Sequence, residues 1–321
     1  MRKTRFIMAL ALGALSTAAL LSSTTASAQR YVGGDISLLP ECEKAGAIYK
    51  TPEGAEIEDL LPFLHDEGMN AMRVRLFVNP DDHKAKYPDR YDPNACQNLE
   101  YILPLCQRIV SGGFSLMLDF HYSDTWADPA KQWTPESWKN LTDEQLHAKI
   151  YDYTKEVLET LKAAGATPAF IQPGNEISYG MLWGAEDAPS STLKKTLMGS
   201  DANWTRLGKL LSNAIRACRE TCPEAKIVLH TERVAQPDVL ENFYRQMRKL
   251  DVDYDIIGLS YYPYFHGDMN VLDKALTGLQ DSFPDKNIMI VETGYSYKWE
   301  VPGTCLLYTS PSPRDPKTSR M

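Results

Sequence analysis

Two glutamates stand at the ends of apolar, strand-like runs 116 positions apart in the chain. Glu176 closes the run PAFIQPGNEI, and Glu292 lies in NIMIVETGYS. Glycosidic bond hydrolysis uses two carboxyl groups: one protonates the leaving oxygen, and the other attacks the anomeric carbon or activates water. Either glutamate alone could equally form an ion pair or cap a helix. As a pair at strand ends, they predict a sugar hydrolase.

A repeated pattern along the chain predicts the elements that hold these residues. Helical segments end at Gly, and a β-rich apolar run of the kind buried on both faces of a parallel sheet follows within a few residues. The predicted strands span residues 32–37, 69–78, 114–123, 166–176, 226–232, 254–263 and 287–296, with helices near 203–220, 236–250 and 269–281. Alternation without internal hairpins predicts an α/β fold.

Polar and aromatic residues gather at the C-terminal ends of these runs, where a closed barrel builds its active site. An open doubly wound sheet also binds ligands there, but it needs a glycine-rich phosphate turn after the first strand. Gly33 and Gly34 lie inside the first strand, and no GxGxxG motif opens a helix. We therefore predict a single (β/α)8 TIM barrel over residues 29–304, a length that suits the ~250 residues typical of this fold.

Six stretches carry a resemblance to a known family: GGDIS, MRVRLFVNP, LDFHYSDTWADPAKQ, QPGNEISYGMLWG, GLSYYPYFHG and VETGYSY. Together they resemble glycoside hydrolase family 53, the endo-β-1,4-galactanases. The resemblance implies a retaining enzyme, with Glu176 as acid/base of raised pKa after strand four and Glu292 as ionised nucleophile after strand seven. It also implies that Asn175 holds the sugar 2-hydroxyl. Calcium occurs in the family, but no calcium site is identifiable here.

Charged strand residues supply further candidates. Arg73 and Arg75 are two apart on one strand and share a face, so either can hold Glu292 in its charged form. A structural ion pair within the barrel is the alternative. Asp119 is a substrate-binding candidate, although it and Asp124 can instead shape the following loop.

Histidine and tyrosine side chains at the same strand ends form a second group. His121 and His230 are expected either to bind sugar hydroxyls or to tune Glu176, with core packing as the alternative. Tyr262 is expected to donate a hydrogen bond to the nucleophile or to pack in the interior.

Four tryptophans lie in the loops after the third and fourth predicted strands. Exposed aromatic rings stack on the apolar face of galactose, so Trp126 and Trp183 are candidate sugar platforms. Trp133 and Trp138 are expected to anchor the loops.

The N-terminus reads as an export signal. A basic start, RKTR, precedes an apolar stretch over residues 6–21 and an Ala-Ser-Ala site at residues 26–28. This pattern predicts a signal peptide over residues 1–28 and a secreted or periplasmic protein. A membrane anchor is the alternative, but the stretch is short for a span.

Charge and cysteine content limit the partners. Without the three positive charges of residues 1–28 and the net two of residues 305–321, the formal charge falls from −8 to −13. Such an acidic body argues against nucleic acid and membrane surfaces. The spacing of the cysteines does not indicate a zinc site, since no paired CxxC or HExxH motif occurs. We expect a polysaccharide substrate, as the resemblance implies, with a monomeric protein and no cofactor. Candidate disulfides are Cys218–Cys222 and Cys96–Cys106.

The chain changes character after Gly303, in the segment TCLLYTSPSPRDPKTSRM. One interpretation is a Ser/Pro-rich disordered extension. We instead expect residues 305–321 to be the translation of a sequencing adapter, so that the barrel stops after strand seven. Missing an eighth βα unit, such a barrel has two unpaired edges and is expected to be unstable. Re-amplifying the gene from source DNA tests this expectation.

Two other functions stay open at this point. A related retaining barrel hydrolase acting on mannan, xylan or glucan carries the same pair of glutamates. A non-catalytic galactan-binding protein needs neither, which weighs against it.

Overall fold

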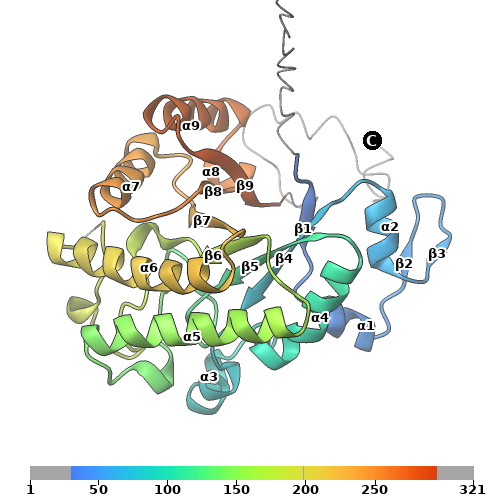
Figure 1. The fold of residues 1–321 in the computed structure, drawn as a ribbon, viewed down its shortest axis with the longest axis horizontal. Helices are drawn as coiled ribbons and strands as arrows, with labels where there is room; N and C mark the ends of the chain where they lie inside the picture. The colour runs from blue at the N-terminus through green and yellow to red at the C-terminus, as the bar shows by residue number, and fades with distance from the viewer. Residues whose placement is uncertain (1–29, 198, 295–321) are drawn as a thin grey trace, which may run out of the picture. The chain divides into compact units, whose positions relative to one another are not determined.

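The computed structural model describes residues 30–197 and 199–294, and its main feature is a seven-stranded parallel sheet. The strands are β1 (Gly33–Asp35), β4 (Ala71–Leu76), β5 (Ser115–Phe120), β6 (Phe170–Pro173), β7 (Lys226–Thr231), β8 (Ile256–Tyr261) and β9 (Asn287–Thr293). Each pairs in parallel with the next in this order. All seven predicted strands are confirmed (Figure 1). The predicted signal peptide and the tail over 305–321 lie outside the described residues.

One longer helix lies between each pair of consecutive strands, as parallel crossovers require. These helices are α2 (Leu60–Asp66), α4 (Leu99–Ser111), α5 (Asp143–Ala163), α6 (Asp201–Thr221), α7 (Pro237–Lys249) and α9 (Met269–Ser282). Local signals start several of them. Thr142 and Gln145 form a capping box at the start of α5, for example, and so satisfy two backbone N–H groups.

The remaining helices, none longer than α2, lie in the loops. They are α1 (Leu39–Lys44), α3 (Pro80–Lys86), α8 (Pro263–His266), η1 (Pro88–Arg90), η2 (Glu136–Trp138), η3 (Ile177–Tyr179) and η4 (Ser190–Thr192). The expectation of no hairpin was wrong, because β2 (Tyr49–Lys50) and β3 (Glu56–Ile57) pair antiparallel. Two residues per strand are too few for an alternating apolar pattern, so this hairpin carries no signal in the sequence.

Contacts of Arg73 show that the sheet curls. This side chain on β4 lies 3.1 Å from Asp35 on β1 and 3.3 Å from Glu292 on β9. In a flat sheet, β1 and β9 would stand roughly 29 Å apart, at about 4.8 Å per strand spacing. One arginine can reach both only if the sheet rolls toward a barrel. Among the described residues, β1 and β9 are the edge strands, with one neighbour each.

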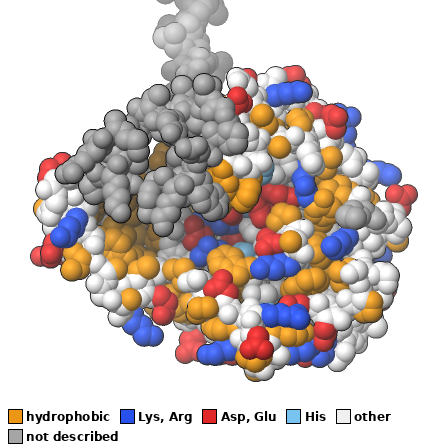
Figure 2. All heavy atoms as spheres, turned by 180° about the vertical axis from the view of Figure 1, so that it is seen from behind, with side chains coloured by type: hydrophobic (Ala, Val, Ile, Leu, Met, Phe, Trp, Pro, Cys, Tyr) orange, Lys and Arg blue, Asp and Glu red, His pale blue; other side chains and the backbone are white. Residues whose placement is uncertain are grey.

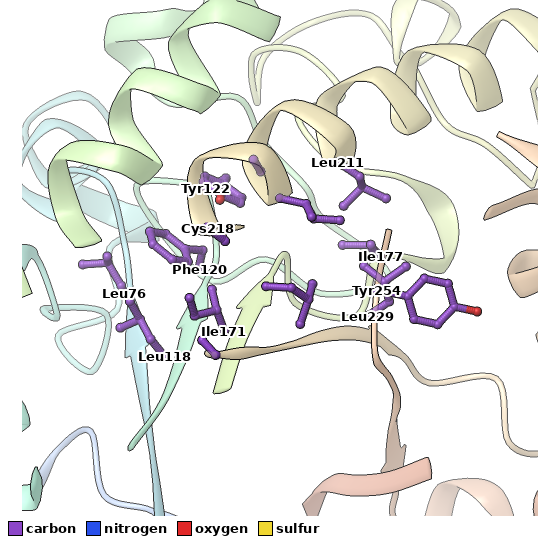
Figure 3. Packing of buried hydrophobic residues seen from close by; sticks show 14 of the residues in the cluster. Leu76, Leu118, Phe120, Tyr122, Ile171, Ile177, Leu211, Cys218, Leu229 and Tyr254 are labelled. Carbon is purple, nitrogen blue, oxygen red and sulfur yellow. The ribbon is translucent and has the colours of Figure 1, made fainter. Parts of the chain in front are cut away.

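Alternation along the strands divides the apolar residues into two clusters. Outward residues such as Leu76, Phe120 and Ile171 pack with Leu211 and Cys218 of α6 (Figure 3). The alternate strand residues form a smaller cluster that includes no helix residue: Met117, Phe170, Val228 and Ile256, with Tyr31, Ala169, Met289 and Val291 against them. This second cluster is an apolar layer on the inner face of the curled sheet, as in barrel interiors.

The cysteines within the described residues are all free, so neither predicted disulfide forms. Cys218 and Cys222 are one helical turn apart, and the Cys222 N–H donates to the Cys218 carbonyl at 2.8 Å. Side chains at this spacing have Cβ atoms about 5–6 Å apart, beyond the ~3.5–4.5 Å of a disulfide. Cys106 is buried within α4, whereas Cys96 lies in the preceding loop beside Tyr101.

No helix in the described part of the chain is both long enough and apolar enough to span a bilayer.

Candidate active site

A layer of polar side chains lies on the inner face of the sheet, beyond the apolar layer. Asp119, Gln172 and His230 each stand two residues after an apolar-layer residue on β5, β6 and β7. Because side chains alternate along a strand, this spacing keeps them on the same face. Arg73 on β4 and Ser260 on β8 complete the polar layer. Figure 2 shows acidic and basic side chains close together near the middle of one face of the molecule.

Arg73 is the centre of this layer. Its buried guanidinium bonds Asp35 Oδ2 at 3.1 Å, Asp119 Oδ2 at 2.7 Å and Asn175 Oδ1 at 2.9 Å, and it lies 3.3 Å from Glu292 Oε2. Burial alone would lower the pKa of Arg73, but the surrounding carboxylates, Asp119 first, raise it above its usual value. The cation is therefore permanent, and it favours negative charge on its neighbours.

Glu292 is held as a carboxylate. Tyr262 donates its hydroxyl hydrogen to Glu292 Oε1 at 2.5 Å, and Arg73 faces Oε2. Burial would raise the pKa of Glu292, but Arg73, His230 and the Tyr262 hydrogen bond outweigh it and hold that pKa below its usual value. Of the two arginines predicted to hold Glu292 in its charged form, Arg73 faces it rather than Arg75. Tyr262 hydrogen-bonds Glu292, which was one of the two roles expected for that tyrosine.

A β-bulge aims Glu292 inward. The register between β8 and β9 shifts after Leu259, so that Leu259 faces Ile290 but Ser260 faces Glu292. The extra residue, Val291, packs against the inner apolar layer, and Glu292 then follows on the same face. Without the bulge, the period of two would direct Glu292 toward the helices.

Glu176 has the opposite electrostatic character. It follows β6 in the left-handed conformation, with φ of 49°, and Ser260 Oγ donates to its Oε1 at 2.7 Å. The turn also needs Gly174, whose φ is 107° and where a Cβ would lie 2.6 Å from Ile177. Burial first, and then the charges of Glu292 and Glu232, raise the pKa of Glu176 to about 8.

Asn175 is fixed between these groups. Its Oδ1 accepts from Arg73, and its Nδ2 donates to the Ala127 carbonyl at 2.8 Å. Gln132 Nε2 donates to the Asn175 carbonyl at 2.7 Å. These bonds occupy one of the two Nδ2 hydrogens of Asn175 and fix the orientation of its amide group.

Three candidates for sugar contact lie too deep for it. Asp119 and His230 are fully buried and His121 is 2 % exposed, so the expected sugar contacts do not fit their positions. Asp119 anchors Arg73, and His121 Nε2 lies 3.0 Å from Asp119. Asp119 and His230 extend from β5 and β7 into the packed interior and make their hydrogen bonds there. His121 directly follows β5, and its Nδ1 accepts a hydrogen bond from the Ala127 N–H.

His230 is instead linked to the Glu176 carboxyl group through Ser260. Its Nε2 lies 2.8 Å from Ser260 Oγ, the group that bonds the Glu176 carboxyl. Burial first, and then Arg73, lower the pKa of His230 to about 4, so the ring is neutral near pH 7.

Of the two tryptophans expected to be sugar platforms, Trp183 is buried and Trp126 is partly exposed. Trp183 is 1 % exposed, which corrects its assignment as a sugar platform; its Nε1 donates to the Tyr179 carbonyl, and Lys195 covers its ring. Trp126 is partly exposed, and Arg75 stacks on it at 4.6 Å from the ring centre. Trp138 is buried as a loop anchor, and Trp133 packs edge-on against Trp183.

Three residues of the site escaped notice in the sequence: Gln172, Ser260 and Glu232. Gln172 and Ser260 lie at inner positions on their strands, so a strict period-two reading would have found them. Glu232 carried only its charge as a signal, whereas Asp35 is among the polar residues expected at the strand ends. Within residues 30–197 and 199–294, no group of three or more His, Cys, Asp or Glu side chains is arranged to hold a metal ion.

Sequence comparison now decides the family. The profile of Glycosyl hydrolase family 53 matches residues 31–308. The chain belongs to glycoside hydrolase family 53. As a member of that family it is a glycoside hydrolase, which agrees with two carboxyl groups of opposite protonation tendency in one site.

Relatives of this family 53 chain cover most of its length. The arabinogalactan endo-β-1,4-galactanase of Cellvibrio japonicus is 36 % identical over 274 residues, which are 83 % of this chain and 66 % of the relative. The catalytic domain of the Ignisphaera aggregans family member is 33 % identical, with a TM-score of 0.71 over 83 % of this chain and 68 % of that one. A structure of fungal β-1,4-galactanases is 30 % identical, with a TM-score of 0.69, over 84 % and 75 %. The chain thus spans about two thirds to three quarters of these proteins.

Proposed function

We propose that this family 53 enzyme cleaves internal β-1,4-galactosidic bonds in galactan or type I arabinogalactan, with retention of anomeric configuration. The observation that carries the proposal is the opposite shift of two site carboxyls, because Glu176 tends to keep its proton and Glu292 tends to lose it. The substrate is proposed from relatives named as galactanases at 36 % and 30 % identity. A related hydrolase of mannan, xylan or glucan and a non-catalytic galactan-binding protein are the alternatives.

In the proposed first step, a Glu292 oxygen attacks the anomeric carbon of the galactosyl unit. The bond to the leaving oxygen breaks, and Glu176 transfers its proton to that oxygen. Ser260 holds Glu176 Oε1, so Oε2 is the oxygen free to carry this proton. Arg73 and Tyr262 keep Glu292 ionised and oriented before the attack.

In the proposed second step, Glu176 is a carboxylate and removes a proton from water. The water oxygen attacks the anomeric carbon on the face that the leaving group vacated, and the bond to Glu292 breaks. Two inversions give net retention, and both glutamates return to their starting protonation states. Asn175 is positioned to hold the 2-hydroxyl through both steps by its remaining amide hydrogen.

Product analysis tests the substrate assignment. The purified enzyme is incubated with galactan, mannan and xylan, and products are separated by length while NMR follows the first anomer released. Galactan is expected to yield oligosaccharides of β configuration, with no cleavage of the other polymers. Cleavage of mannan or xylan instead would support the related hydrolase, and binding of galactan without cleavage would support the binding protein.

The pH profile of kcat/KM is expected to be bell-shaped. The free enzyme needs Glu292 ionised and Glu176 protonated, so activity rises with pH through the low pKa of Glu292 and falls as pH passes about 8. Initial rates on galactan between pH 3 and 10 check this. As a control, Glu176→Gln should lose the alkaline limb on an aryl galactoside whose activated leaving group needs no proton. An unchanged limb in that variant would assign it to another group.

We also propose that the enzyme is exported as a monomer and acts outside the cytoplasm. The support is the basic and apolar N-terminal pattern over residues 1–28 together with a substrate too large to enter a cell. N-terminal sequencing of the mature protein is expected to begin at Gln29. A mature protein that retains Met1 would refute cleavage.

A further inference from the structure

A third carboxyl group, Glu232, lies beside the catalytic pair and has no part in the two steps above. It follows β7 directly and is 8 % exposed. Ser178 Oγ hydrogen-bonds its Oε1, and Arg233 Nε lies 2.9 Å from the same oxygen. Its other oxygen is buried and has no hydrogen-bond partner among the described residues. A buried carboxylate is costly unless it is paired and hydrogen-bonded, and only one oxygen of Glu232 has such partners.

Ser178 connects Glu232 to the turn that carries Glu176. It lies two residues after Glu176, in η3, and its carbonyl accepts a hydrogen bond from Thr196 Oγ1 at 2.8 Å. Arg233 Nε also donates to Ser178 Oγ, at 3.2 Å. The left-handed backbone of Glu176 is a conformation that its surroundings must hold in place. The Glu232 carboxylate therefore ties the end of β7 to this strained turn.

Glu232 also acts on Glu176 through its charge. After burial and Glu292, Glu232 is the next cause that raises the pKa of Glu176. The charged and titratable groups facing Glu232 are Arg233, Asp128 and Tyr244, in addition to Glu176. Burial raises the pKa of Glu232 itself to about 7, so it is largely ionised near pH 8, where Glu176 titrates.

Glu292 and Glu232 both place negative charge near Glu176, but only one of these charges is lost during the reaction. This inference rests on the proposed function. When Glu292 attacks, its carboxylate becomes a neutral ester, so its repulsion of negative charge on Glu176 disappears. Glu232 forms no bond to the sugar, and above about pH 7 it keeps its charge in the second step. In the second step Glu176 must be basic enough to deprotonate water, and a weaker base slows that transfer.

We propose that Glu232 is a positioning residue for Glu176: its charge preserves the basicity of Glu176 while Glu292 is esterified, and its bond to Ser178 holds the turn. It touches neither substrate nor reacting atoms in this role. The charge can be tested apart from the hydrogen bond by a variant that keeps an acceptor oxygen at position 232.

The test uses Glu232→Gln and Ser178→Ala. Glu232→Gln removes the charge but keeps an acceptor oxygen for Ser178, whereas Ser178→Ala removes the bond and, because that bond lowers the pKa of Glu232, also favours the neutral carboxyl group. An aryl β-galactobioside with an activated leaving group makes the second step limit kcat, and kcat/KM on galactan reports the first. Glu159→Gln, an exposed carboxylate on α5, is the control for the change in net charge. Thermal melting confirms that each variant is folded.

In Glu232→Gln, the alkaline limb of kcat/KM is expected to move down by about one pH unit, on the scale of shifts from a nearby like charge. The acid limb of kcat should move down by less, because Glu232 is partly protonated in that pH range. The plateau of kcat should fall severalfold. Ser178→Ala should lower rates and move the limbs in the same direction by a smaller amount, because loss of its hydrogen bond raises the pKa of Glu232. Glu159→Gln should resemble the wild type. If Glu232→Gln does not fold, Glu232→Asp, which keeps the charge, should keep both limbs in place.

Unmoved limbs in a folded Glu232→Gln variant, or limbs that move in Glu232→Asp, would overturn the proposal. Failure of the proposed function would give a different result. In that case the wild type would show no turnover of galactan, or the Glu176→Gln variant would be as active as the wild type.

Discussion

Glu292→Ala is expected to lower kcat on galactan by about 10⁴-fold or more, because no other group can form the glycosyl-enzyme bond. The nearest alternatives are unsuitable: Tyr262 keeps its proton, since burial and Glu292 raise its pKa well above the usual value, and Asp119 is fully buried. Binding of galactan should be largely retained, because the sugar-contacting surface is unchanged. Steady-state rates and the binding constant of the same preparation check both statements.

Rescue by azide gives this prediction a stereochemical readout. The Ala side chain leaves space for a small anion on the nucleophile's side of the sugar. With an activated aryl galactoside, Glu292→Ala should therefore form α-galactosyl azide, after one inversion. Glu176→Ala should form β-galactosyl azide, because azide then replaces water in the second step. β-Galactosyl azide from Glu292→Ala, or retention of more than about 1 % of wild-type kcat, would contradict the assignment of the nucleophile.

Arg73→Met should destabilise the protein as well as inactivate it. Its removal leaves Asp119 fully buried without the cation that holds the pKa of Asp119 at about 2 against burial. Breaking a buried ion pair of this kind typically costs about 3–5 kcal/mol. Activity is lost too, since Glu292 loses the charge that keeps it ionised. Urea denaturation and galactan rates measure the two effects.

The direction in which stability changes with pH tests whether Asp119 is the cause of the destabilisation. In the wild type, the pKa of Asp119 is depressed, so its stabilisation is present above about pH 4 and is lost as pH falls toward 2. In Arg73→Met, the unpaired carboxylate should instead destabilise the fold at pH 7, and part of the stability should return as pH falls and Asp119 takes up a proton.

Arg75→Met is the matched control for this experiment. Arg75 lies on the same strand and face, but it is more exposed, stands 3.6 Å from Asp35 and stacks on Trp126. Its loss should cost far less stability and should leave the pH dependence unchanged. Equal losses in the two variants would show that the effect is general to the strand and does not arise from the Arg73 network.

Strand positions were predictable because the physical signal is local. Runs such as FSLMLDF are apolar on both faces, and glycine after a helix marks where each run begins. The extent to which a side chain is buried was not predictable in the same way. Trp183 and His230 look alike as strand-end or loop residues, yet whether each is buried depends on neighbours such as Lys195 and Ser260, which are distant in the chain.

The sequence alone determined the family, the seven parallel strands and the identity of two candidate catalytic glutamates, since all of these follow from residue types at short spacings. The electrostatic difference between the two glutamates depends on the tertiary structure. The curl of the sheet brings β1 and β9 to the same arginine, and the bulge at Val291 directs Glu292 inward. Burial, Glu232 and Arg73 then separate the pKa values of Glu176 and Glu292, because electrostatic interactions depend on distance and burial in space rather than on position in the chain.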